Sequence, residues 1–315
     1  MNQSVNPDAN PAKSRSGMLS YAIFILVSLS VLTLFTVPFS WEGVAVLFFS
    51  YFLRMFGITA GFHRYFSHNA FKTSRAFQFF LAWIGTMAMQ KGPLWWGSNH
   101  RDHHRYSDTE KDLHSPRKGF WQSHMLWFLR SEHNEYDPKN IKDFYKFPEL
   151  VFIDNHYWLP PLSFAIILYL LGGWIWLVYG YAIATFVLGH GTWTINSLSH
   201  VFGRKRFNTN DDSRNNWLLA VITMGEGWHN NHHHYRHSAN QGFYWYEFDS
   251  SYYILRSLSW IGLIWDLKKP PVHILEEGIK QDAIRKGKEK FKSSTGEWIY
   301  VPIPSSVAAI RSSTT

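Results

Sequence analysis

The chain alternates between long apolar stretches and polar regions rich in charge and histidine. Apolar runs cover residues 19–39 and 44–60, separated by a short polar turn, and each is long enough to cross a bilayer as a helix. A third apolar region, residues 157–195, is too long for one span, and the pair Gly172 and Gly173 near its centre suits a turn. The pattern therefore predicts an all-α membrane protein with four spans, at about residues 19–39, 44–60, 157–172 and 174–195.

The segments outside these runs predict the rest of the chain. Residues 76–89 are apolar but too short to span, so they predict a buried or interfacial helix. Residues 1–17 are polar and predict a disordered tail, and residues 276–315 predict a basic, polar C-terminal tail, which leaves 18–275 as one domain. Arg54 lies inside the second apolar run, where a charge is costly unless it snorkels to the headgroups or faces protein.

Three histidine clusters stand in the polar regions, and a fourth element follows the last apolar run. They are His63-Arg-Tyr-Phe-Ser-His68, His100-Arg-Asp-His103-His104, His229-Asn-Asn-His232-His233 and Asn196-Ser-Leu-Ser-His200. The second and third clusters share the spacing i, i+3, i+4, which places three imidazoles on one face of a helix. His63 and His68 are five residues apart, roughly 140° on an α-helix. Those two side chains therefore need a helix end or a bend to converge.

These clusters predict a metal site. The chain has 17 histidines and no cysteine, which excludes disulfides, cysteine-bound zinc and iron–sulfur clusters within it. Imidazole suits zinc, copper, iron and nickel, and nine clustered histidines are too many for one ion but fit two. Two metals at a membrane surface indicate redox chemistry on a lipid, because acid–base groups cannot remove hydrogen from an unactivated methylene. Structural roles are expected for His114, His124, His133, His156, His190, His234, His237 and His273, with His234 and His237 the nearest to exceptions.

Charge and aromatic content agree with a membrane setting. The net charge is +8, and no lysine or arginine occurs in residues 16–53 or 158–203. By the positive-inside rule the histidine clusters and both termini lie on the cytoplasmic face, and two spans between the clusters keep them on that face. The 16 tryptophans and 16 tyrosines suit a large membrane–water interface. Anionic lipid headgroups are therefore a simpler partner for the basic residues than nucleic acid.

At these residues the sequence resembles the membrane fatty-acyl desaturases, in particular the Δ9 acyl-CoA and acyl-lipid branch. The matching segments are Gly57-Ile-Thr-Ala-Gly-Phe-His63-Arg-Tyr-Phe-Ser-His68, the run from His100 to His114, Asn196-Ser-Leu-Ser-His200, and Gly225-Glu-Gly-Trp-His-Asn-Asn-His-His233. The resemblance implies four transmembrane helices under a cytosolic helical cap that carries two non-haem irons. It also implies O₂-dependent formation of a cis double bond at carbon 9. The ligands it implies are His63, His68, His100, His103, His104, His200, His229, His232 and His233, with Asn196 holding a metal-bound water.

The resemblance also implies partners, and the chain departs from the pattern in two places. Asp112-Leu113-His114 replaces Asp-Pro-His, and Ser98 and Asn99 stand where animal acyl-CoA enzymes carry a charged pair. The substrate is therefore a long-chain acyl-CoA or an acyl-lipid. A separate ferredoxin or cytochrome b5 with its reductase is expected to supply electrons, and residues 92–96 favour a bacterial inner membrane over the endoplasmic reticulum. Candidate substrate contacts are the tunnel walls Trp95 and Trp96, the tunnel end Tyr51, and the basic residues Arg117, Lys118 and Arg130.

Two other functions remain open from sequence. A fatty-acid or alkane hydroxylase uses the same scaffold and differs in its product, an alcohol in place of an alkene. A histidine-rich metal transporter is the more distant alternative, because transporters place their ligands within the membrane and these clusters lie outside the apolar runs.

Overall fold

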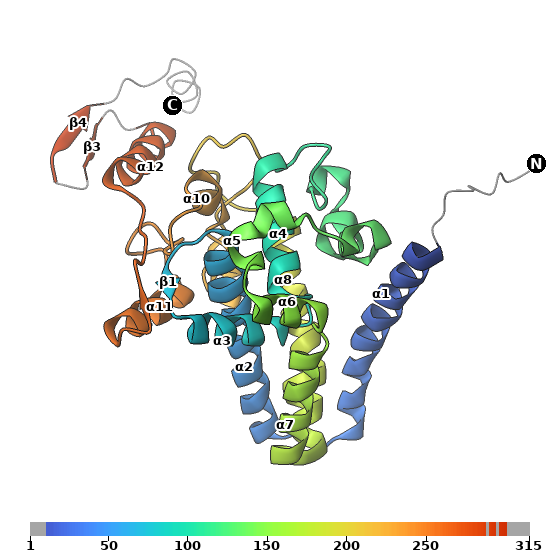
Figure 1. Cartoon of the computed structure of the whole chain (residues 1–315). Coiled ribbons are helices and arrows are strands. Elements are labelled where there is room, and N and C mark those ends of the chain that lie inside the picture. Colours follow the sequence, from blue (N-terminus) through green and yellow to red (C-terminus); the bar gives the residue numbers. More distant parts are fainter. Residues whose placement is uncertain (1–10, 288–289, 294–295, 301–315) are drawn as a thin grey trace, which may run out of the picture. The chain divides into compact units, whose positions relative to one another are not determined.

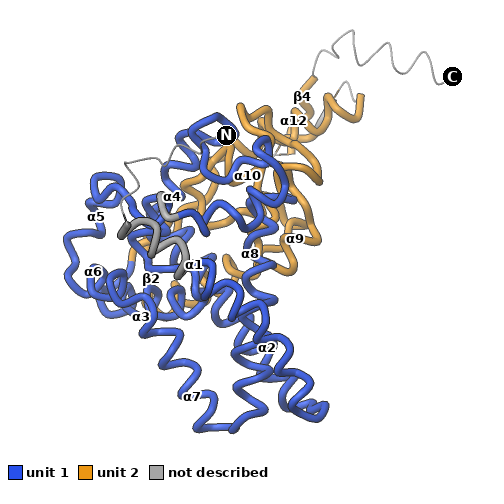
Figure 2. The backbone as a smooth tube through the Cα atoms, turned by 90° about the vertical axis from the view of Figure 1, so that its right-hand side faces the viewer, with its two compact units in different colours: residues 1–69, 73–198 blue, residues 70–72, 199–315 orange. Residues whose placement is uncertain are grey.

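The structure is a computed structural model that describes residues 11–287, 290–293 and 296–300. It is mostly helical and divides into two compact units (Figure 2). Unit 1 comprises residues 1–69 and 73–198, and unit 2 comprises residues 70–72 and 199–315. Most of the expected N-terminal tail, residues 1–10, and the end of the C-terminal tail, residues 301–315, lie outside the described residues. Helix α1 begins at Pro11, so residues 11–17 are helical.

Unit 1 contains the apolar helices and a series of short turns (Figure 1). Its elements are α1 (Pro11–Ser30), η1 (Val31–Thr36), α2 (Trp41–Phe56), η2 (Gly57–Ser67), α3 (Arg75–Thr86), α4 (Pro93–Tyr106), η3 (Pro116–Lys118), η4 (Gln122–Leu126), η5 (Trp127–Leu129), η6 (Ser131–Asn134), η7 (Pro138–Ile141), α5 (Lys142–Tyr145), α6 (Pro148–Asn155), α7 (Leu159–Trp176), η8 (Leu177–Ile183) and α8 (Ala184–Val201), whose last turn enters unit 2.

Unit 2 holds shorter helices joined by long loops. Its elements are α9 (Trp217–Ile222), α10 (His229–His234), α11 (Ser250–Trp260), β2 (Ile264–Trp265), α12 (Val272–Arg285), β3 (Lys290–Lys292) and β4 (Trp298–Tyr300), with β1 (Lys72–Thr73) at the boundary. Strands β3 and β4 pair antiparallel. In the described ranges, these short strands are the departure from the expected all-α fold.

Among the described residues, two helical runs are long and apolar enough to cross a membrane, Trp41–Ser67 and Leu159–Val201. The second, 43 residues long, is broken at Gly172 and Gly173, whose backbone angles are not helical. Beyond the break the chain reverses, and Gly180 packs against Leu168. The expected turn at this glycine pair is therefore confirmed. The first apolar helix, Ser20–Thr36, is shorter, so four membrane spans remain a prediction.

Arg54 faces protein and is fully buried in α2. Its guanidinium donates to Thr185 Oγ1 at 2.6 Å and to the carbonyl of Gly180 at 3.3 Å. That carbonyl lies in η8, a π-helical segment. Arg54 thus satisfies a backbone acceptor that a regular α-helix would pair internally. Of the two environments expected for Arg54, contact with protein is the one found.

Helix α3 confirms the short helix expected near residues 76–89. The Ser74 hydroxyl accepts from the Phe77 amide at its N-terminus, as N-capping serines do. The helix runs so close to η2 that a Cβ at Gly57 would lie 2.6 Å from the Gly85 backbone nitrogen. Glycine at both positions permits this approach, which fixes η2, the carrier of the first histidine cluster, against α3.

Candidate metal centre and apolar pocket

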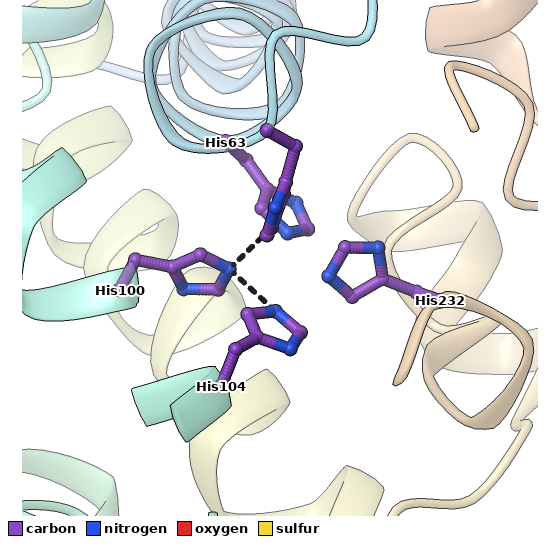
Figure 3. Close-up of side chains that lie close together, drawn as sticks. His63, His100, His104 and His232 are labelled. Atoms are coloured by element: carbon purple, nitrogen blue, oxygen red, sulfur yellow. Dashed lines mark hydrogen bonds between the residues drawn. The ribbon is translucent and has the colours of Figure 1, made fainter. Parts of the chain in front are cut away.

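Four histidines converge within unit 1. His63 and His68 come from η2 and its C-cap, whereas His100 and His104 come from α4. One ligand atom from each lies within 4.8 Å of those from the others. His100 Nε2 is 3.0 Å from the Nε2 atoms of both His68 and His104. Figure 3 shows the rings of His63, His100 and His104 directed toward one another.

The convergence of His63 and His68 follows from the type of helix that carries them. Residues Gly57–Ser67 form a π-helix, in which hydrogen bonds close from i to i+5. Residues five apart therefore stack on one side, and the His63 and His68 ring centroids are 5.0 Å apart. The bend that the five-residue spacing requires is a change of helix type. Such π segments occur frequently at functional sites.

Helix α4 presents its histidines from a fixed N-terminus. Gly92 precedes Pro93 at the first helical position, and buried Asp154 accepts hydrogen bonds from the Leu94 and Trp95 amides at 3.0 Å. This carboxylate satisfies two donors that every helix start leaves unpaired. The indole of Trp96 stacks on His100, with centroids 4.8 Å apart. His103, on the same helix, is not part of the four-histidine set and instead contacts Asp112.

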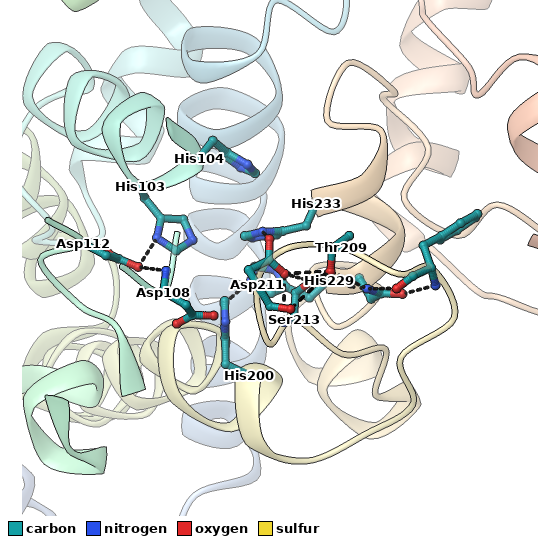
Figure 4. A network of polar contacts seen from close by, with 12 residues as sticks. His103, His104, Asp108, Asp112, His200, Thr209, Asp211, Ser213, His229 and His233 are labelled. Carbon is teal, nitrogen blue, oxygen red and sulfur yellow. Dashed lines mark hydrogen bonds and ion pairs between the residues drawn. The ribbon is translucent and has the colours of Figure 1, made fainter. Parts of the chain in front are cut away.

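Three histidines converge within unit 2. The ligand atoms of His200, at the end of α8, and of His229 and His233, on α10, lie within 4.8 Å of one another. His200 Nε2 and His229 Nε2 are 3.0 Å apart, and Figure 4 shows these residues beside Asp211. His232 is buried on the same helix, with its ring centroid 6.1 Å from that of His229. Helical spacing thus gathers the third cluster, as expected.

The two asparagines inside the third cluster hold α10 in place. Both are fully buried. Asn230 Oδ1 accepts from the Arg206 and Phe207 amides at 2.7 Å. Asn231 Nδ2 donates to Glu247 at 2.8 Å, and its Oδ1 accepts from Arg206. The sequence analysis assigned these asparagines no role, although two amide side chains between clustered histidines were the available signal that α10 is anchored by hydrogen bonds.

Two carboxylates contact histidines of the second and third clusters, Asp112 with His103 and Asp211 with His233. Burial raises the pKa of the Asp112 carboxyl, but attraction to His103 and His114 outweighs it and holds that pKa below its ordinary value. For Asp211 burial again raises the pKa, but the hydrogen bond from His233, the attraction to that ring and the hydrogen bonds from Ser213 together outweigh burial and lower the pKa. Both groups are therefore carboxylates at neutral pH, acceptors for an imidazole N–H.

The donor sets fit a metal that binds imidazole. An imidazole nitrogen carries one lone pair or one hydrogen, so His100 Nε2 cannot form ordinary hydrogen bonds to both of its 3.0 Å neighbours. A cation that accepts their lone pairs accounts for this arrangement. Because the chain has no cysteine, nitrogen and oxygen are the available ligand atoms, which suits iron, copper, zinc or nickel.

A pocket of about 160 Å³ lies within unit 1 and reaches the four-histidine set at His100. Its walls come from α1, the start of α4, η5 and α8, and are mainly aromatic and aliphatic. Trp95, Trp96 and Asn196 line it, and Lys91 is the one lysine or arginine among the described residues that do. Tyr51 does not line it, but its hydroxyl lies against Gly191, between the lining residues His190 and Thr192.

The three basic residues expected near the substrate are not among the residues that line this pocket. Arg117 donates to the carbonyl of Asp108 at 2.8 Å, and Lys118 donates to the carbonyls of Glu110 and Asp112 at 2.7 Å. Both hold the loop that follows α4. Arg130 is exposed and contacts Gln122.

Several histidines outside the clusters have structural partners. His124 bonds to His190 at 3.1 Å and to Ser197 at 3.0 Å. His234 stacks on Phe207 and contacts Glu277. His114 packs on His103, with centroids 4.3 Å apart, and groups with Asp112.

Comparison with known proteins identifies the family. The family model described as fatty acid desaturase matches residues 13–259. The chain is 39% identical over 231 residues to an sn-2 palmitoyl-lipid 9-desaturase of Nostoc sp. (71% of this chain, 81% of that protein). It is 39% identical over 235 residues to an sn-1 stearoyl-lipid 9-desaturase of Synechocystis sp. (74% of each). An acyl-CoA C20 Delta5-desaturase of Anemone leveillei is 39% identical over 260 residues (79% of this chain, 82% of that protein). The chain therefore belongs to the fatty acid desaturase family.

Proposed function

We propose that this protein uses O₂ to place a cis double bond at carbon 9 of a long saturated acyl chain. The observation that carries the proposal is the apolar pocket that ends at His100, a member of a convergent histidine set. Two hydrogens leave the acyl chain, two electrons and two protons arrive, and O₂ leaves as two waters. The similar 9-desaturases support carbon 9, whereas other relatives are named for carbons 5 and 7.

Two irons are the metals we propose for the histidine sets, with ligands His63, His68, His100, His103, His104, His200, His229, His232 and His233, and Asn196 through a water. When bound, iron supplies the O₂ chemistry needed to remove hydrogen from an unactivated methylene. The residues of the chain bind and orient the substrate. Trp95 and Trp96 form an apolar wall that excludes water, and the stacking of Trp96 on His100 brings that wall to the metal site.

The acyl carrier we propose is a glycerolipid. Ser98 is buried and donates to the Asp137 carbonyl, and Asn99 donates to the Trp95 carbonyl. Neither offers a charge to the phosphates of CoA, and Arg117 and Lys118 donate to loop carbonyls. Exposed apolar side chains on the long helices, such as Leu170 at 76% and Phe49 at 64%, suit contact with lipid. Acyl-CoA is the alternative that the substrate test distinguishes.

We further propose four membrane spans, with the histidines and both termini on the cytoplasmic side of a bacterial inner membrane. A separate ferredoxin or cytochrome b5, with its reductase, would supply the electrons. The exclusion of lysine and arginine from residues 16–53 and 158–203 supports this orientation.

The test is a fatty-acid profile in a host that requires unsaturated fatty acids, with an electron donor co-expressed. Wild type is expected to yield monounsaturated acids with the double bond located at carbon 9 by mass spectrometry. His232→Ala is expected to yield none, while His273→Ala, at an exposed histidine, is expected to match wild type. Hydroxylated acids would assign a hydroxylase instead. Labelled acyl-lipid and acyl-CoA supplied to membranes separate the two carriers.

A further inference from the structure

Asp112 is a buried carboxylate of unit 1 that accepts three hydrogen bonds. Its Oδ2 accepts from His103 Nδ1 at 3.1 Å and from the Asp108 amide at 2.9 Å. Its Oδ1 accepts from the His114 amide at 3.2 Å. The side chain is 0% exposed. Asp112 is therefore placed to hold the His103 imidazole, while the Nδ1 atom of His114 lies farther away, 3.8 Å from Oδ1.

Asp211 repeats this arrangement in unit 2. Its Oδ2 accepts from His233 Nδ1 at 2.8 Å. Its Oδ1 accepts from the Ser213 amide at 3.0 Å and from the Thr209 hydroxyl at 2.9 Å, and from the Ser213 hydroxyl. Figure 4 shows both carboxylates beside their histidines. The two histidines belong to the two clusters of identical spacing, and each receives its carboxylate from a loop outside its own helix.

In both pairs the carboxylate contacts Nδ1, so Nε2 is the ring nitrogen on the side away from the carboxylate. The other histidines of the convergent sets present Nε2 to one another, as His68, His100 and His104 do in unit 1 and His200 and His229 do in unit 2. A carboxylate at Nδ1 fixes the proton on that nitrogen, sets the orientation of the ring and makes Nε2 more basic. The ring is then prepared to bind a cation through Nε2.

We propose that Asp112 and Asp211 are positioning residues that prepare His103 and His233 to bind iron. The inference rests on the proposed function, because it assumes that these histidines are metal ligands. A merely structural role would be to fasten the loops that follow α4 and α8. The two roles differ in what they predict for metal affinity.

The test is iron binding by the purified full-length protein in detergent, with Asp112→Asn and Asp211→Asn. Asparagine keeps the shape and removes the charge. Each variant is expected to bind Fe²⁺ about 10–100-fold more weakly in competition with a chelator, and to change the Mössbauer spectrum of bound ⁵⁷Fe. Asp249→Asn is the matched control, since Asp249 is a buried carboxylate that accepts from the Gln241 and Tyr252 amides at the start of α11. It is expected to lower the melting temperature with iron affinity unchanged.

Wild-type iron affinity and spectrum in both variants, with only a lower melting temperature, would overturn the proposal. If Asp211→Asn does not fold, Thr209→Val removes one donor to that carboxylate, and we expect a smaller loss of affinity in the same direction. Unchanged affinity in that variant would count against Asp211. A wild-type protein that binds no iron would overturn the proposed function and this inference together.

Discussion

The hydroxyl of Tyr51 lies against Gly191, beside one wall of the pocket. A Cβ at Gly191 would lie only 2.6 Å from the Tyr51 hydroxyl oxygen, and the neighbours of Gly191 line the pocket. We expect Tyr51→Ala to open space beside this wall and shift the products toward longer acyl chains, measured by gas chromatography of the fatty acids. Phe52→Ala is the control, because Phe52 is 42% exposed on the same helix. An unchanged profile for Tyr51→Ala would remove Tyr51 from the pocket boundary.

The titration of His124 is expected to make the free energy of unfolding depend on pH. Burial, followed by the neighbouring His190, lowers the pKa of His124 from 6.5 to about 4. Between these values the unfolded chain binds more protons than the folded one, so the free energy of unfolding falls as pH is lowered from 7 toward 4. We expect His124→Gln to reduce this slope in melting temperatures measured across that range. The exposed His273→Gln is expected to keep the wild-type slope, and equal slopes in all three proteins would contradict the account.

The sequence pattern identified the clustered histidines but not the carboxylates that contact them. Spacing alone places His100, His103 and His104 on one helix face, and the structure confirms that helix. Asp112 is nine residues from His103, and Asp211 is 22 from His233. Such contacts depend on the conformation of the loops, which cannot be predicted from the spacing of residues in the sequence. Loop conformation likewise decides the contact of Arg117, a candidate substrate contact that donates to the Asp108 carbonyl.

At the scale of elements, the close contact of η2 with α3 limits what can occupy Gly57. An added Cβ there meets the backbone of Ile84 and Gly85 at 2.6 Å, and backbone cannot move aside as a side chain can. We expect Gly57→Ala to cost about 1–3 kcal/mol in the free energy of unfolding, the usual range for overpacking. Thermal unfolding in detergent measures this cost.

Gly97→Ala on α4 is the matched control. Its added Cβ would come closest to the end of the Ile141 side chain, at 3.0 Å, which can shift, and would make an ordinary contact with the Phe66 carbonyl oxygen at 3.5 Å. Alanine also favours the helix by about 1 kcal/mol. A near-neutral effect is therefore expected. Equal losses in the two variants would show that close backbone approach is not what Gly57 provides.

The positions of the helices could be predicted from the sequence better than whether each helix is of the α or the π type. The apolar runs predicted α2, α7 and α8, and the glycine pair predicted the reversal at Gly172. The π-helical geometry of η2 could not be predicted from apolar spacing, because it depends on packing against α3. Only the five-residue interval between His63 and His68 signalled it.

At the scale of the whole molecule, the arrangement of spans can be tested directly because the chain has no cysteine. Phe39 is 66% exposed between the first two apolar helices, and Glu110 is exposed in the loop after α4. With four spans, Phe39→Cys is expected to react with an impermeant maleimide on intact cells, and Glu110→Cys and Lys280→Cys only after permeabilisation. The cysteine-free wild type provides the background. Labelling of all three positions from one side would contradict the proposed topology.

The π-helix at Gly57–Ser67 also bears on how such a site can change over generations. A π turn holds one residue more than an α turn between stacked positions. The insertion or deletion of a single codon between His63 and His68 would therefore alter their alignment, whereas most codon substitutions there would leave it intact. In this stretch, selection is therefore expected to act on the number of residues between the two histidines more than on their identity.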